Sequence, residues 1–301
     1  MSYRPNPGTE CCPGEVNRIM PNYVSRMWMG AGDGGLVAAF YGPSQITVNL
    51  GDSGQEVTII EETQYPFSEQ INFRVHTGQP VKFTLWLRIP GWCQNPGLSI
   101  NGDEHPEKLM PGSFVPISRT FSDGDVIGLT LPMELKLQSW KRGGISIERG
   151  PVVFALRIDE DWQVDVSDAK STPEFPAWNL YAASDWNYAL AVDQEHLAQQ
   201  IEIIQRDVSA DPWNLDQPPI ELRVPARKVN GWKIKKAKKV KNLVWRDQVE
   251  TKITTKGDFR FTPNLPKPKK LNKMLADKVE TITLVPYGCT HLRITIFPNG
   301  S

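Results

Sequence analysis

The sequence has few cysteines, no net charge and no long apolar run. Its 301 residues contain four cysteines, and 34 basic side chains balance 34 acidic ones. Four cysteines in a chain of this length do not form the disulfide framework of a small secreted protein. A net charge of zero argues against a surface built for nucleic acid or for an anionic membrane. We therefore expect neither nucleic acid nor a membrane as a partner.

The sequence also lacks the segments that would assign a compartment. No apolar run approaches the roughly 20 residues of a membrane span. Residues 1–7 have no apolar signal-peptide core. A cytoplasmic, a periplasmic and a secreted parent protein all agree with this sequence, so the localisation is left open.

Several familiar catalytic motifs are missing as well. No glycine-rich phosphate loop precedes a helix, and there is neither a Gly-x-Ser-x-Gly elbow nor a His-Glu-x-x-His helix. The glycine-rich run at 30–35 precedes a strand-like segment, and we interpret it as an interdomain turn. The carboxylate groups at 61–62 and 159–161 lie at strand ends or in loops, where solvation is expected. The four histidines are scattered at His76, His105, His196 and His291.

What the sequence does contain is a long series of strand-like segments. Residues 81–89 alternate between apolar and polar, which places every second side chain on one buried face. Asn101-Gly102 is a hairpin signal. Regular strands and turns over residues 31–134 predict a β-sandwich. Further strand-like segments predict a second β-sandwich over residues 135–301, interrupted by an irregular, tryptophan-rich insertion.

One early segment has the pattern of a helix. Pro13 suits the first helical position, and Ile19, Met20 and Tyr23 recur at helical spacing. Pro21 falls inside this pattern, so we expect a kink or a break there. The predicted fold class is therefore all-β, with two consecutive β-sandwich domains preceded by a short N-terminal helical segment over residues 1–30.

Two adjacent cysteines, Cys11-Cys12, stand at the start of this predicted helix. Two thiols at one point suit a soft metal such as zinc, or a nucleophile beside a metal ligand. A helix N-terminus favours thiolate over thiol. The alternative is a pair of small side chains that fill a gap at the helix end, and the local sequence does not decide between the two. Cys93 and Cys289 stand alone in strand-like surroundings, and we expect buried free thiols.

Two further stretches each admit two interpretations. The aromatic side chains of the insertion, from Trp162 to Tyr188, could stack on sugar rings, but core packing is favoured. The lysine-rich stretch at 233–241 could form a basic patch for a polyanion. A solvated edge strand or hairpin is favoured, because lysine protects exposed strand edges from pairing with other chains.

Four stretches of the sequence resemble, in the same order, the DUF1680 proteins. This glycoside hydrolase group, family 127, includes the β-L-arabinofuranosidases. The stretches are Cys11-Cys12-Pro13-Gly14 with Asn17-Arg18, Leu85-Trp86-Leu87-Arg88-Ile89-Pro90-Gly91-Trp92, Ile147-Glu148-Arg149-Gly150-Pro151-Val152-Val153-Phe154-Ala155, and residues 284–298. The resemblance implies a helical (α/α)-barrel followed by two β-sandwiches. Residues 1–30 would then be a short helical remnant at the end of the barrel, and this chain would be the C-terminal portion.

The resemblance also implies roles for the cysteine pair. Cys11 would be the nucleophile of a retaining glycosidase and form a thioglycosyl intermediate. Cys11 and Cys12 would both bind zinc. The family's acid/base glutamate, its remaining zinc ligands and its sugar-binding histidines lie in the barrel, which this sequence lacks. We therefore expect no glycosidase activity from the chain alone, with zinc absent or only partly bound, and a plant-type oligosaccharide or polysaccharide as the substrate of the parent.

Two other functions are left open by the sequence. The chain could be a stand-alone carbohydrate-binding or scaffold module, because Trp86 and the insertion supply aromatic side chains. It could also be a half-enzyme that acts in trans with a separate barrel chain. In that case Ile19, Met20, Met27 and Trp28 would form an exposed apolar surface. Such a surface predicts a homodimer or binding to the missing barrel domain.

Overall fold

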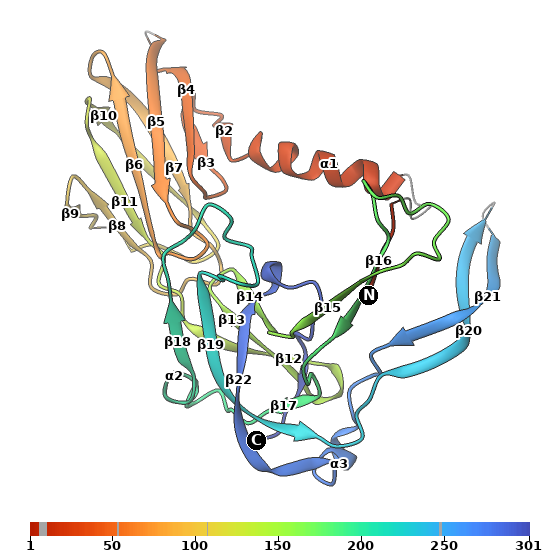
Figure 1. Ribbon diagram of the computed structural model, residues 1–301. Helices are drawn as coiled ribbons and strands as arrows, with labels where there is room; N and C mark the ends of the chain where they lie inside the picture. The colour runs from red at the N-terminus through yellow and green to blue at the C-terminus, as the bar shows by residue number, and fades with distance from the viewer. Residues whose placement is uncertain (6–10, 53, 107, 247–248) are drawn as a thin grey trace.

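The computed structural model describes residues 1–5, 11–52, 54–106, 108–246 and 249–301. Strands dominate, as the all-β prediction requires (Figure 1). The α-helices within these residues are α1 (Cys11–Val24), α2 (Leu197–Gln200) and α3 (Pro268–Leu271). No helix of the described residues is long and apolar enough to cross a membrane.

Two sheets make up the first half of the chain. One has the order β10-β7-β3-β2, and the other has the order β4-β5-β6-β11-β8-β9. The first sheet contains β2 (Trp28–Gly30), β3 (Leu36–Ala38), β7 (Val81–Arg88) and β10 (Phe114–Phe121). The second contains β4 (Ser44–Leu50), β5 (Gln55–Thr63), β6 (Gln70–Thr77), β8 (Gly97–Ile100), β9 (Asp103–Glu104) and β11 (Val126–Thr130). All pairs are antiparallel except β3 with β7.

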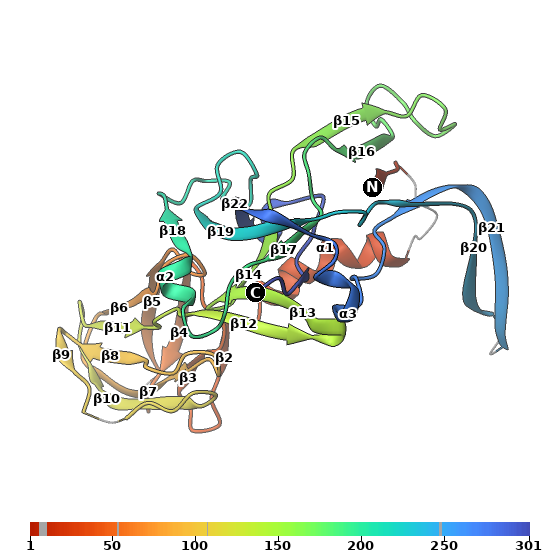
Figure 2. The ribbon, with the colours of Figure 1, turned by 90° about the horizontal axis from the view of Figure 1, so that it is seen from below.

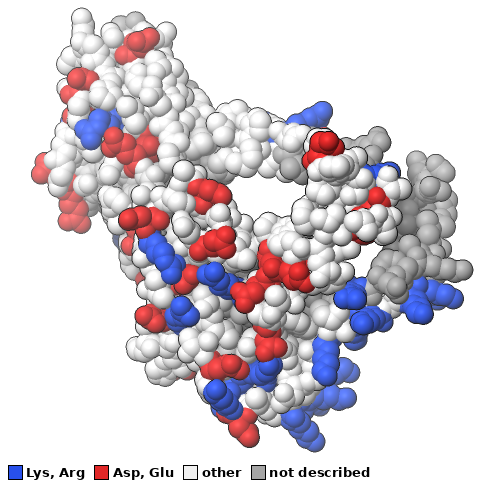
Figure 3. All heavy atoms as spheres, viewed as in Figure 1, with Lys and Arg blue, Asp and Glu red and all other residues white. Residues whose placement is uncertain are grey.

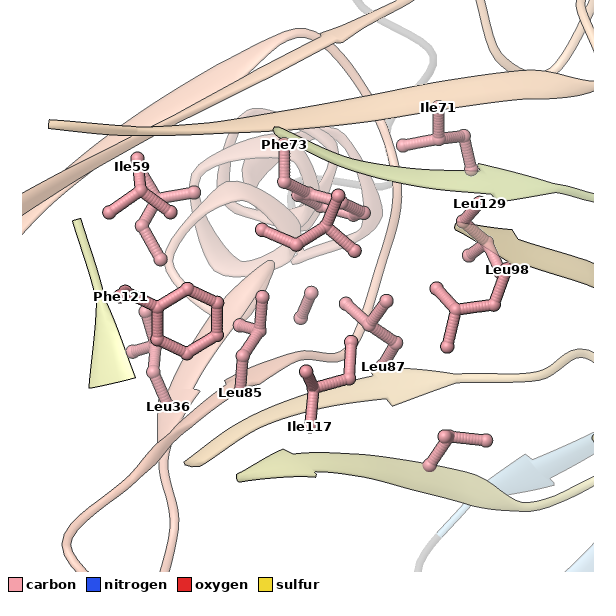
Figure 4. Close-up of a cluster of buried hydrophobic side chains, with 14 of the residues drawn as sticks. Leu36, Ile59, Ile71, Phe73, Leu85, Leu87, Leu98, Ile117, Phe121 and Leu129 are labelled. Carbon is pink, nitrogen blue, oxygen red and sulfur yellow. The ribbon is translucent and has the colours of Figure 1, made fainter. Parts of the chain in front are cut away.

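Apolar side chains from both sheets meet in a buried cluster, the first core (Figure 4). The alternation over β7 is confirmed, because every second side chain of this strand is buried. Asn101 and Gly102 both have positive φ, as a tight hairpin between β8 and β9 requires. The first core includes Leu36, Ile59, Ile71, Phe73, Leu85, Leu87, Leu98, Ile117, Phe121 and Leu129.

The glycine-rich run at 30–35 has a different place from the one predicted. It connects β2 to β3, which pair with each other in the same sheet. Gly34, at φ 77°, supplies the left-handed conformation of this turn. The run is therefore a hairpin turn, and the prediction of an interdomain turn was wrong.

A single larger sheet carries most of the second half. Its order is β12-β13-β14-β22-β19-β17, with β18 paired to β19 and β23 paired to β13. The strands are β12 (Leu135–Trp140), β13 (Gly144–Arg149), β14 (Val152–Leu156), β17 (Tyr188–Leu190), β18 (Glu202–Gln205), β19 (Ile220–Val229), β22 (Leu275–Pro286) and β23 (Phe297–Pro298).

This large sheet folds over into two layers, and strand β14 belongs to both. Its first residues pair with β13, and the segment from Phe154 to Leu156 pairs with β22. In Figure 2, β12 and β13 lie below β19 and β22. The side chains between these layers form the second core, which includes Ile147, Phe154, Leu222, Leu284 and Phe297. Phe67, from the first half of the chain, also packs into the second core, so the two halves are in direct contact.

The insertion is more regular than predicted. Strands β15 (Glu160–Val164) and β16 (Trp178–Ala182) pair with each other, and β1 (Ser2–Tyr3) pairs with β16. The insertion is therefore regular over these two strands, while residues 165–177 between them form no helix or strand. The lysine-rich stretch lies in a two-stranded ribbon of β20 (Lys235–Arg246) and β21 (Val249–Phe261), so the hairpin interpretation is confirmed.

Helix α1 runs from the edge of the first core toward the insertion (Figure 1). It continues past Pro21 to Val24, so the predicted break does not occur. Pro21 has no backbone N–H, so the helix continues past it without one of its internal hydrogen bonds. Met27 is buried and Trp28 packs against the first core, which corrects their predicted exposure. The exposed apolar side chains of α1 include Ile19 and Met20.

Candidate functional site

Helix α1 begins at Cys11, so the cysteine pair lies in its first turn. The backbone position matches the prediction that the pair stands at a helix N-terminus. The side chains of Cys11 and Cys12 lie outside the described part of the structure. The nucleophilic role of Cys11 and the zinc-binding roles of Cys11 and Cys12 therefore stay predictions.

A zinc site at this pair would need further donors. Zinc takes about four ligands, and two adjacent thiols provide half of them. Glu15, one turn further along, is exposed and forms an ion pair with Arg18 at 2.9 Å. Among the residues that the structure describes, no group of three or more His, Cys, Asp or Glu side chains could hold a metal ion.

The other two cysteines are buried and free, as predicted. The Sγ atom of Cys289 lies 3.6 Å from the carbonyl oxygen of Pro212. Burial raises the pKa of Cys289 to about 11. Burial also raises the pKa of Cys93. Both side chains are therefore thiols near neutral pH, and neither is suited to nucleophilic attack.

The segment before the cysteine pair is fixed to the insertion. Tyr3 pairs with Trp178 across β1 and β16. The guanidinium of Arg4 forms ion pairs with Asp165 at 2.9 Å and with Asp168 at 3.2 Å. Arg4 precedes Cys11 by seven residues, and seven residues span at most about 25 Å. The backbone of Arg4, whose side chain contacts the insertion, therefore lies within about that distance of the cysteine pair.

The other end of α1 is fixed to the first core. The backbone amide of Ala39 donates to the carbonyl of Met27 at 2.8 Å. The rings of Tyr23 and Phe40 are 5.2 Å apart. The indole N–H of Trp28 donates to the hydroxyl of Ser44 at 3.0 Å. Helix α1 is consequently held at its C-terminal end by the first core, while the segment before it is held by the insertion.

A carboxylate close to this junction is buried, against expectation. The side chain of Glu61 accepts hydrogen bonds from the amide of Gly42 and the hydroxyl of Ser44, each at 2.9 Å. The residue is 2 % exposed. Burial raises the pKa of Glu61 to about 7, and the two hydrogen bonds oppose that rise. The predicted solvation of Glu61 was therefore wrong.

A cavity of about 620 Å³ lies beside the insertion. It is lined by Glu160 and Trp162 from β15, by His291, and by a loop that includes Asp211 and Trp213. Glu160 is mostly buried and accepts a hydrogen bond from the backbone amide of His291 at 3.1 Å. Its second oxygen lies 3.0 Å from His291 Nδ1. Aromatic and carboxylate side chains therefore converge on one hollow.

The favoured interpretation of the insertion, core packing, fits only some of its aromatic residues. Trp186 packs against the second core. Trp162 is 40 % exposed and lines the cavity. The sequence analysis missed Trp213, which lies in a distant loop without a recognisable motif. It lines the same cavity as Trp162 only through the tertiary fold, so no local signal was available to find it.

Comparison with known proteins identifies relatives for part of the chain and for its fold. Residues 35–133 match the family described as "Beta-L-arabinofuranosidase, GH127 middle domain". No curated protein sequence matches the chain. Among solved structures, a GH127 β-L-arabinofuranosidase from Geobacillus stearothermophilus T6 is similar, with a TM-score of 0.57 and 18 % identity over 96 % of this chain.

Two further solved structures show the same similarity. The GH127 β-arabinofuranosidase BT3674 has a TM-score of 0.59 and 17 % identity over 96 % of this chain. A structure titled "Glycoside hydrolase" has a TM-score of 0.55 and 18 % identity over 90 % of this chain. The match covers 37 % of the Geobacillus chain and 38 % of BT3674. It covers 37 % of the third chain. This chain therefore spans well under half the length of the structures that it resembles.

Proposed function

We propose that this chain, which resembles the C-terminal portion of the GH127 β-L-arabinofuranosidases, is the β-rich part of a glycoside hydrolase of that type. The observation that carries the proposal is the match of residues 35–133 to the GH127 middle domain. The fold similarity over 96 % of the chain extends the likeness beyond that domain. Residues 35–133 also contain the buried residues of the first core.

Cys11 is the proposed nucleophile of the whole enzyme. It lies in the first turn of α1, where free backbone amides and the helix dipole favour the thiolate form. A retaining glycosidase also needs a group that protonates the leaving oxygen and then activates water. By the family resemblance this acid/base belongs to the barrel, which the sequence does not contain. We therefore propose that the chain alone does not hydrolyse glycosides.

Zinc binding by the chain alone is proposed to be weak. Cys11 and Cys12 offer two thiolates, and a stable tetrahedral site needs about two more ligands. When bound, zinc would stabilise the thiolate form of both side chains near neutral pH. The missing ligands would come from the helical part of the whole enzyme.

The exposed face of α1 is the proposed contact with that helical part. Ile19 and Met20 are 60 % and 62 % exposed, and Val24 lies exposed at the end of the same helix. Apolar side chains grouped on one helix favour burial against a partner. The similar structures contain more than half of their chains outside the match, which supplies the occupant that we propose.

Activity and metal content test the catalytic proposal together. The purified chain should not hydrolyse an aryl β-L-arabinofuranoside. Its zinc content by mass spectrometry should stay below one equivalent and should fall in Cys11→Ser and Cys12→Ser. Cys93→Ser removes a buried thiol far from α1 in the sequence and should leave the zinc content unchanged. Robust hydrolysis by the purified chain, or a full equivalent of zinc in both serine variants, would refute the proposal.

Self-association tests the role of the helix face. Without the helical part, the chain should associate through α1 as its concentration rises, as measured by sedimentation velocity. The double substitution Ile19→Glu with Met20→Glu should restore the monomer. Met110→Glu changes a side chain that is similarly exposed but lies in a loop between the strands, and it should have no effect. Equal sedimentation of all three proteins at every concentration would contradict the proposed contact.

A further inference from the structure

The cavity beside the insertion has the dimensions of a ligand site. Its volume of about 620 Å³ falls within the usual range of small-molecule pockets, roughly 300–1,000 Å³. A second hollow of about 760 Å³ shares two wall residues with it, Arg157 and Asp159. The two hollows therefore share a wall, and each has the volume of a small-molecule pocket.

The first aromatic wall of this cavity is held in place by its neighbours. The ring of Trp162 stacks on Tyr3 with centroids 5.3 Å apart and planes inclined by 23°. The rings of His291 and Trp178 meet it edge-on at 5.0 Å and 6.0 Å. Contacts on several sides fix the indole, yet 40 % of the residue is exposed. Trp162 is therefore a rigid apolar surface that a ligand reaches without displacing it.

The second aromatic wall is fixed in a different way. Trp213 is 45 % exposed, and its ring lies 4.9 Å from that of Phe67. Gly288 packs so closely against the indole that a Cβ there would lie 2.5 Å from Trp213 Cε3. A glycine at this position is what allows the ring to lie where it does. The cavity thus has two restrained indoles, and stacking on them costs little side-chain entropy.

Polar side chains of fixed orientation complete the cavity. Arg157 lines both hollows, and its Nη1 atom donates to the buried carboxylate of Glu221 at 3.1 Å. Across the cavity, the amide nitrogen of Asn214 lies 3.4 Å from Asp211 Oδ2, and its oxygen accepts from the backbone amide of Asp216 at 2.8 Å. The planar guanidinium of Arg157 and the planar amide of Asn214 can form hydrogen bonds with adjacent hydroxyl groups of a sugar.

The charge of the lining selects among saccharides. The lining contains four acidic residues, Asp159, Glu160, Asp211 and Asp216, and one arginine, Arg157. Acidic side chains gather near the centre of the face shown in Figure 3. Such a surface repels uronic acids and other anions, because like charges at close range disfavour binding. Uncharged rings with free hydroxyls meet no such repulsion.

We propose that this cavity is a binding site for a neutral saccharide, with a sugar ring stacked on Trp162 or Trp213 and its hydroxyls bonded to Asp211, Asn214 and Arg157. The site lies on the insertion and the second half of the chain, and it uses neither cysteine of the pair. The inference therefore stands apart from the glycosidase proposal, and binding can be measured without turnover.

Calorimetric titration of the purified chain tests the site. The probes are arabinotriose, xylotriose and cellotriose, with trigalacturonate as the anionic comparison. We expect at least one neutral trisaccharide to bind with a Kd of millimolar or tighter, and trigalacturonate to bind at least tenfold more weakly. Failure of all three neutral sugars to bind a folded chain, or tighter binding of trigalacturonate, would overturn the proposal.

Substitutions locate the binding on the cavity. At least one of Trp162→Ala and Trp213→Ala should weaken binding of the neutral sugar at least tenfold. Trp140→Ala is the matched control, because Trp140 is also an exposed indole on a strand but does not line the cavity, and it should leave the Kd unchanged. Asn214→Ala, a loop substitution that leaves both indoles, should weaken binding severalfold while circular dichroism stays native. Unchanged affinity in Asn214→Ala and both cavity tryptophan variants would place the binding elsewhere and refute the site.

Discussion

Arg149 of β13 donates a hydrogen bond from Nη2 to Glu69 at 2.8 Å and so joins the second half of the chain to the first. The two partners differ in environment, since the side chain of Arg149 is 11 % exposed and that of Glu69 is 38 % exposed. Burial lowers the pKa of Arg149. The same Glu69 oxygen accepts from the backbone amide of Met133 at 3.0 Å, so one carboxylate fixes both the guanidinium and the connection that precedes β12.

Removing either partner of this pair should have unequal effects. Glu69→Ala leaves a buried guanidinium without its counter-charge and should lower the free energy of unfolding by about 2–4 kcal/mol. Arg149→Met leaves a carboxylate that reaches water and should lower it by only about 1 kcal/mol. Urea denaturation measures both. Glu62→Ala breaks a well-exposed pair with Arg74 and should change stability by less than about 0.5 kcal/mol. A larger loss in Arg149→Met than in Glu69→Ala would contradict this account.

The glycine that follows Arg149 should be similarly sensitive. Gly150 has φ of 56°, and a Cβ there would lie 2.6 Å from Met133 Cγ. Gly150→Ala combines backbone strain with a clash and should lower the free energy of unfolding by about 2–4 kcal/mol. Gly231→Ala is the control, because it has φ of 77° but no atom within 4 Å of the new Cβ, and it should lose only about 1–2 kcal/mol. Equal losses in the two variants, by urea denaturation, would show that Met133 yields freely.

Glu61 should make the stability of the chain fall as pH rises through neutrality. Its pKa is about 7 in the folded protein and near 4.5 in the unfolded chain, so the folded state holds the proton more tightly. That contribution is complete below pH 4.5 and is lost as pH rises through about 7, a decrease of about 3 kcal/mol. The lowered pKa values of Asp125 and Asp165 act in the opposite sense and at lower pH.

Urea denaturation between pH 5 and 8 separates these contributions. Glu61→Gln cannot ionise, so its unfolding free energy should be nearly constant over a window in which the native chain loses stability. Above pH 7 the variant should be the more stable protein. A parallel pH dependence of Glu61→Gln and the native chain would show that another group is responsible.

Where the sequence carried a local period, prediction succeeded. Every second side chain of β7 is buried, because one face of a sandwich strand meets the core. The same rule could have found Glu61, which lies in phase with Val57 and Ile59 on β5. Its charge suggested solvation, whereas the strand period places it on the inner face. We expected Glu61 to be solvated because carboxylates usually lie at the surface. The strand periodicity predicted the inner face instead, and this was correct.

The cavity shows what local sequence does not contain. Strand β15 is mostly exposed and is held by β16, so its residues gave no alternating pattern. His291 and Glu160 meet across 131 residues of chain. Trp213 joins them from a third segment. Convergence of this kind depends on the order of strands in the sheets, which neither propensity nor spacing reveals.

The four cysteines should divide into two classes when the native chain reacts with a thiol reagent. Cys93 and Cys289 are buried, and burial raises the pKa of both, so they should react only after unfolding. Cys11 and Cys12, at the start of α1, should react first and retain their rate at mildly acidic pH if the helix N-terminus favours the thiolate. Titration with Ellman's reagent should therefore find at most two fast thiols. The double substitution Cys11→Ser with Cys12→Ser should abolish the fast phase, and Cys93→Ser should leave it intact. A fast phase that survives the double substitution would mean that a buried thiol is accessible and that the cysteine pair has no special reactivity.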